Sequence, residues 1–177
     1  VLALRDAFPQ HQLRIDPNSN WTLETSLKVA DKLKGCLEYY EDPTPTLEGM
    51  AKLHRLTGLP LATNMVVTNW SELRQSMALG SVQIVLSDHH YWGGLRATQA
   101  LARTCEAFGL GLSMHSNSHL GISLMAMSFQ LSGLARRDVH PCINWFKGVR
   151  IEDDVLVTAA GCERLTVSSK ELRVLGN

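Results

Sequence analysis

Short apolar runs rich in Leu, Val and Ile alternate with longer stretches of helical periodicity over residues 1–131. The expected strand and helix pairs are 13–16 with 23–34, 37–41 with 47–57, 61–64 with 71–79, 82–88 with 95–108, and 112–115 with 122–131. Gly35, Gly58, Gly80 and Gly109 lie near the expected helix ends, where glycine commonly terminates a helix. The pattern therefore predicts five strand–helix units.

Serial strand–helix units predict an α/β fold with a parallel sheet, because right-handed crossovers place the helices outside the sheet. Periodicity leaves two arrangements open, an open doubly wound sheet and a closed barrel. A complete eight-unit barrel typically needs about 250 residues, and this chain has 177. We expect an open sheet or part of a barrel, with residues 1–128 carrying the strand–helix units and 129–177 forming a divergent tail.

The charge balance predicts a small polar partner. Lys plus Arg and Asp plus Glu both number 17, which gives no electrostatic case for binding nucleic acid or a membrane surface.

No apolar run approaches the roughly 18 residues of a membrane span. The four cysteines form no CxxC pair, and the first residues lack the pattern of a signal peptide. We therefore expect a cytoplasmic protein with reduced thiols.

A polar or charged residue stands at the end of each expected strand. These residues are Asp16, Glu41, Asn64, Asp88 and His115, and one strand–helix unit separates each from the next. Parallel α/β folds build their sites at strand carboxyl ends, where loops and helix amino termini converge. Any one of these residues alone could be a helix cap or a turn residue. The five together predict a functional site.

The donor types at these strand ends predict a metal site beside a base. Asp16, Glu41 and Asn64 offer only oxygen ligands, which suit magnesium or manganese better than zinc. Asp88 and His115 end the next two strands, where a carboxylate could orient an imidazole as a general base.

Five ordered segments carry a family resemblance: RIDPNSNW (14–21), YYEDP (39–43), GLPLATNM (58–65), LSDHHYW (86–92) and MHSNSH (114–119). They resemble successive strand ends of glucarate dehydratases, which are enolase-superfamily enzymes with a mandelate racemase-like barrel. The resemblance implies the carboxyl-terminal half of a TIM-type (β/α)8 barrel, with about five to six strand–helix units.

The resemblance also assigns roles to the matching residues. It implies that Mg2+ is held by Asp16, Glu41 and Asn64, with Glu48 as an alternative to Glu41, and that His115 and Asp88 form the catalytic dyad. It places four residues beside the substrate: Asn18, Asn64, Ser116 and Asn117. The implied reaction is the dehydration of a sugar diacid of the D-glucarate type to a keto-deoxy diacid, so the protein would be a carbon–oxygen lyase.

Three other functions stay open at this point. They are a related acid-sugar dehydratase, a catalytically inactive half barrel that binds a metal or a partner, and an unrelated open-sheet binding protein. The family also has an amino-terminal capping domain and a Lys-x-Lys pair on an earlier barrel strand, and no lysine precedes Asp16 here. We therefore expect a fragment of a longer enzyme, or half of an assembly that is completed by an amino-terminal half or by a second copy.

Overall fold

The computed structural model describes residues 1–115, 126, 128–134, 155–158 and 161–164. The chain divides into two compact units, Val1–Cys142 and Ile143–Asn177. In the part of the chain that is described, no helix is long and apolar enough to cross a membrane.

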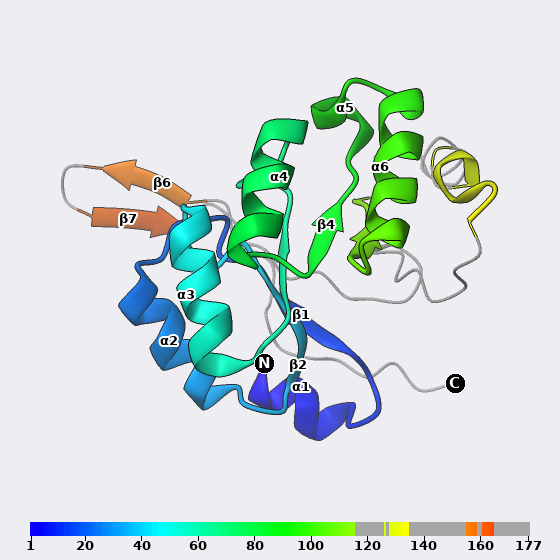
Figure 1. Ribbon diagram of the computed structural model, residues 1–177. Coiled ribbons are helices and arrows are strands. Elements are labelled where there is room, and N and C mark those ends of the chain that lie inside the picture. The colour runs from blue at the N-terminus through cyan, green and yellow to red at the C-terminus, as the bar shows by residue number, and fades with distance from the viewer. Residues whose placement is uncertain (116–125, 127, 135–154, 159–160, 165–177) are drawn as a thin grey trace. The chain divides into compact units, whose positions relative to one another are not determined.

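The first unit contains a five-stranded parallel sheet (Figure 1). Its strands are β1 (Leu13–Ile15), β2 (Leu37–Glu41), β3 (Leu61–Thr63), β4 (Ile84–Leu86) and β5 (Gly111–Ser113). They lie side by side in sequence order, and every neighbouring pair is parallel. A doubly wound sheet reverses its strand order at a switch point, whereas the described strands always add on the same side. The strand order is that of a TIM-type barrel.

Helices connect successive strands, as the sequence predicts. They are α2 (Leu23–Lys32), α3 (Leu47–Thr57), α4 (Trp70–Leu79), α5 (His89–Trp92) and α6 (Leu95–Ala107), while α1 (Leu2–Ala7) precedes β1. Side-chain oxygens of Thr22, Thr46 and Asn69 cap the amino termini of α2, α3 and α4. Gly58 ends α3 in the left-handed region with a φ of 69°. The observed helices α2, α3, α4 and α6 match their expected ranges to within about two residues.

Two helical segments differ from the expected pattern. Periodicity did not predict α5, because a four-residue helix is too short to show a helical pattern. The helix expected at 122–131 lies partly outside the described residues, although Ala126 and residues 128–131 are helical.

Alternate strand residues face the two sides of the sheet. Tyr40, Leu61, Val85 and Leu112 belong to the main core that also contains helix residues such as Met50 and Leu101. Tyr39, Ala62 and Leu86 form a second, smaller cluster. Because side chains alternate along a strand, these two clusters lie on opposite faces, with the main core between sheet and helices. The sheet is buried on both faces, which explains its nearly continuous apolar runs.

The second unit contains a hairpin that falls within residues 129–177, the segment expected to be a divergent tail. Strands β6 (Val155–Thr158) and β7 (Gly161–Arg164) pair antiparallel. Residues 129–134 belong to the first unit. The expected boundary at residue 128, between the strand–helix units and a divergent tail, stays a prediction.

Candidate metal centre and catalytic base

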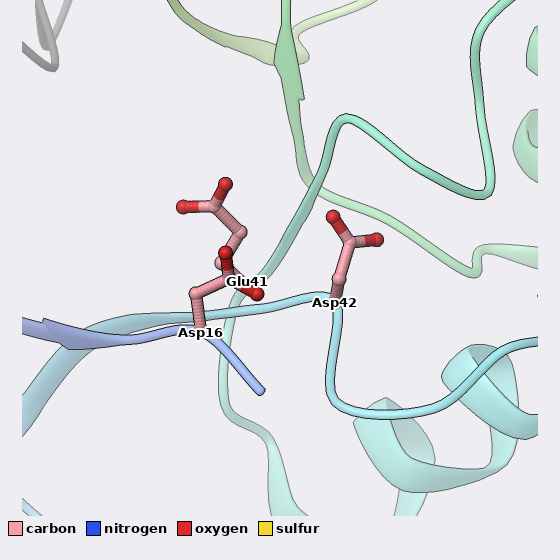
Figure 2. Close-up of side chains that lie close together, drawn as sticks. All are labelled: Asp16, Glu41 and Asp42. Atoms are coloured by element: carbon pink, nitrogen blue, oxygen red, sulfur yellow. The ribbon is translucent and has the colours of Figure 1, made fainter. Parts of the chain in front are cut away.

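Three carboxylates meet at the ends of β1 and β2. Asp16 follows β1, Glu41 is the last residue of β2, and Asp42 comes next (Figure 2). One oxygen from each of the three lies within 4.8 Å of the others. Oxygens on opposite sides of a magnesium ion would be about 4.2 Å apart, since Mg–O contacts are near 2.1 Å. The cluster is close to the size that one hard cation requires.

Asp42 is fully buried and was not among the residues singled out from the sequence. Its carboxylate accepts hydrogen bonds from the Thr63 hydroxyl and, at 2.9 Å, from the Asn64 backbone N–H. Burial, with a smaller contribution from the charges of Glu41 and Asp16, outweighs these hydrogen bonds and raises the pKa of Asp42 to about 7. Asp42 therefore ties the end of β2 to the end of β3.

Asn64 directly follows β3 and points its amide nitrogen at the dyad. Its Nδ2 lies 3.2 Å from Oδ2 of Asp88 and 3.4 Å from Nδ1 of His115. Its Oδ1 is buried and has no hydrogen-bond partner within the described residues. An amide oxygen in this state is available to a cation.

Glu41 is 4% exposed, and its Oε1 likewise accepts no hydrogen bond of good geometry from the described part of the chain. The same atom lies 3.2 Å from Nε2 of His115, which is an ion-pair contact. Burying a carboxylate oxygen with so little compensation is costly. Together with the free Asn64 oxygen, Glu41 gives the site a donor set that fits a hard divalent cation.

His115 and Asp88 form a close pair at the ends of β5 and β4. The Asp88 carboxylate lies 2.8 Å from Nδ1 of His115 through Oδ2, and its Oδ1 accepts the backbone N–H of His115 at 2.8 Å. This double contact fixes both the ring and its backbone, and it leaves Nε2 facing Glu41. The predicted pairing of Asp88 with His115 is present in the structure.

The pair has opposite pKa shifts. Burial alone would lower the pKa of His115, but hydrogen bonds and charge from Asp88 and Glu41 outweigh it and raise this pKa from 6.5 to about 11. Burial alone would raise the pKa of Asp88, yet the bonds and charge of His115 lower it below 3.8. Without a cation beside Glu41, His115 is therefore an imidazolium at neutral pH.

The remaining expected site residues have different positions. Asn18 is exposed, and its backbone N–H donates to Oδ1 of Asp16 at 2.6 Å, so it helps to fix that carboxylate. Glu48 is exposed in the first turn of α3 and is not part of the acidic cluster found among the described residues. Ser116 and Asn117 lie outside the described residues.

Residues 1–164 match the family profile described as enolase C-terminal domain-like. The chain belongs to this family. This enolase-family chain is 59% identical over 128 residues to a Streptomyces coelicolor protein named probable glucarate dehydratase, an alignment covering 72% of the chain and 30% of that protein.

Solved structures of enolase-family proteins agree with the fold. One, an enolase from Pseudomonas fluorescens with bound magnesium, potassium and tartrate, is 64% identical with a TM-score of 0.72, over 79% of this chain and 33% of that one. Another, an enolase from Gibberella zeae with magnesium, formate and sulfate, is 49% identical with a TM-score of 0.73, over 89% and 37%. The chain thus spans about a third of the length of these relatives.

Proposed function

We propose that this enolase-family chain carries the metal-binding and proton-abstracting part of an acid-sugar dehydratase of the glucarate dehydratase type. The observation that carries this proposal is the position of His115, whose Nδ1 contacts Asp88 and whose Nε2 contacts Glu41. An imidazole held between an orienting carboxylate and an acidic cluster has the arrangement of a general base beside a cation site. The 59% identical relative named probable glucarate dehydratase supports the substrate class.

Asp16, Glu41 and Asn64 are the proposed Mg2+ ligands. Asp42 is the less suitable third donor, because both of its oxygens already accept hydrogen bonds, whereas Oδ1 of Asn64 has no partner among the described residues. When bound, Mg2+ would stabilise negative charge on the substrate carboxylate and offset that of Glu41, which lowers the pKa of His115 toward the range of a working base.

His115 is the proposed base, and Asp88 is its orienting partner. With Nδ1 held by Asp88, the Nε2 atom takes the proton next to a carboxylate of the sugar diacid. The resulting imidazolium returns this proton to the departing β-hydroxyl, the carbon–oxygen bond breaks, and water leaves. The product is an enol that becomes a keto-deoxy diacid. Asn18, Ser116 and Asn117 are the proposed contacts to the substrate.

Magnesium titration of the 177-residue chain by calorimetry tests the metal site. We expect both Asp16→Asn and Asn64→Ala to weaken binding strongly, because the first removes a negative charge from the donor set and the second removes an oxygen ligand. Glu48→Gln is the matched control, because it removes a carboxylate at an exposed position, and its affinity should equal that of the unchanged chain. Absence of binding by the unchanged chain would overturn the proposal.

Turnover separates the proposed enzyme from a metal-binding module. Hexarates of different stereochemistry would be incubated with the chain and Mg2+, and keto product would be trapped with semicarbazide. Turnover that disappears in His115→Asn supports the dehydratase, and the preferred hexarate distinguishes it from a related acid-sugar dehydratase. Magnesium binding without turnover supports an inactive module.

A further inference from the structure

The β4–β5 ladder ends before it reaches the dyad. Its last pair is Leu86 with Ser113, and one further backbone bond joins Ser87 N–H to the Ser113 carbonyl at 2.7 Å. Asp88 and His115 lie beyond this point, where side-chain bonds replace the ladder: the Ser87 hydroxyl lies 3.0 Å from the Ser113 carbonyl, and the His115 N–H donates to Asp88 at 2.8 Å. The dyad geometry therefore depends on contacts outside the ladder.

Gln130 supplies such contacts from the helical segment that follows β5. The side chain is 2% exposed and lies against the residues that immediately precede Asp88 and His115. Its Oε1 accepts a hydrogen bond from the Ser87 hydroxyl. Its Nε2 donates to the Ser87 carbonyl at 3.2 Å and lies 3.4 Å from the Met114 sulfur. One amide thus bridges the two segments that carry the dyad.

We propose that Gln130 is a positioning residue that sets the separation of Asp88 and His115. The importance of this separation rests on the function proposed above, but the contact itself does not involve the metal ligands. A buried polar side chain is expensive unless its bonds are satisfied, and Gln130 satisfies donor and acceptor through the backbone and hydroxyl of Ser87. An apolar side chain would fill the space without fixing the strand ends.

The state of the His115 ring tests this proposal directly. The 177-residue chain labelled with 15N-histidine would be studied by long-range 1H–15N NMR, with His115 assigned by its loss in His115→Gln. In the unchanged chain we expect a slowly exchanging Nδ1–H, because Asp88 holds it at 2.8 Å. In Gln130→Leu we expect this resonance to be lost to solvent exchange, since the Asp88 contact loosens.

Gln99→Leu is the matched control. Gln99 on α6 binds the same segment, at the Phe129 carbonyl and the Ser132 hydroxyl, without touching Ser87 or Met114. Gln99→Leu should therefore leave the His115 resonance unchanged. A retained resonance in Gln130→Leu, or equal loss in Gln99→Leu, would overturn the proposal. If Gln130→Leu does not fold, Ser87→Ala takes its place. It removes the hydroxyl that donates to Gln130 and also contacts the Ser113 carbonyl, so retention of the resonance there would count against the proposal.

Magnesium affinity measured on the same samples keeps the two proposals distinguishable. If the unchanged chain binds no Mg2+, the proposed function fails while the His115 resonance still decides the role of Gln130. If Mg2+ binds but the resonance persists in Gln130→Leu, the proposed function stands and the positioning role of Gln130 fails.

Discussion

At the scale of single residues, the protonation of His115 depends on two carboxylates. The pKa of about 11 exceeds the unfolded value of 6.5, so the folded state binds more protons between these values. The contribution of His115 to stability is therefore complete below about pH 6.5 and is lost as pH rises toward 11. In the metal-free chain, His115 should stay charged through neutral pH.

Glu41→Gln should make His115 easier to deprotonate. Removal of a negative charge 3.2 Å from Nε2 should lower the pKa of His115 by about 1 to 3 pH units, which an NMR titration would measure. Glu48→Gln removes an equal charge at an exposed position and should leave the titration as it was. An unchanged midpoint in Glu41→Gln would contradict the ion pair.

Asp42 should impose the opposite pH dependence from that of an ordinary carboxylate. Its pKa is about 7 in the folded state and 3.8 otherwise, so the free energy of unfolding should fall as pH rises from about 4 to 7. The amide in Asp42→Asn does not titrate, so this variant should lack the slope. In the unchanged chain the slope should lower the free energy of unfolding by up to about 4 kcal/mol across the interval. Urea unfolding at several pH values measures it.

Asp31→Asn on α2 makes the same charge change at an exposed position and controls for net charge in this comparison. A slope that survives in Asp42→Asn would show that another group causes it.

The sequence singled out polar residues at strand ends and did not single out the residues that contact them. Asp88 and His115 were expected to pair, and they do. Asp42 was missed because neighbours on a strand point to opposite faces, whereas its φ of 35° turns the chain beyond Glu41. Gln130 was missed because its partners, Ser87 and Met114, directly follow β4 and β5, and no local pattern indicates such a contact.

At the scale of elements, periodicity and capping residues predicted the five strands and four of the helices. These segments repeat a strong local signal, so tertiary packing did not have to override it. Periodicity could not predict the strand order, because the strands of open and closed parallel sheets show the same apolar runs. The β6–β7 hairpin and the short α5 were missed, since neither forms a pattern long enough to recognise.

Gly111 controls how closely β5 approaches β4. A Cβ at this position would lie 2.7 Å from Cγ1 of Ile84, closer than such atoms pack. Gly111→Ala should therefore destabilise the first unit by about 1–3 kcal/mol in urea unfolding. In a double-mutant cycle, Ile84→Ala should relieve part of this cost, because it removes the clashing atom. Simple additivity of the two changes would exclude the clash as the cause.

At the scale of the whole molecule, the β1 and β5 strands stand at the two ends of the described sheet. No other strand among the described residues pairs with these two, and an open strand edge can accept a further strand. A missing amino-terminal half or a second copy of the chain therefore stays our prediction for what completes the barrel.

Magnesium should stabilise the chain measurably if the proposed site is correct. At a free concentration about 100 times the Kd, binding contributes about 2.7 kcal/mol, which corresponds to a rise in Tm of about 5–10 °C for a chain of this size. Thermal unfolding followed by circular dichroism would measure the rise. Asp16→Asn should show none of it, and Glu48→Gln all of it. A rise that persists in Asp16→Asn would mean that Mg2+ acts elsewhere.

The sequence-ordered sheet also bears on how the protein is made. Because each strand pairs with the one translated just before it, the ends of β1, β2 and β3 can come together while later residues are still inside the ribosome. Asp16, Glu41 and Asn64 would then be in place before His115 is synthesised. We expect a nascent chain stalled after α4 to bind Mg2+ already, so that the cation would stabilise the first three strands during synthesis.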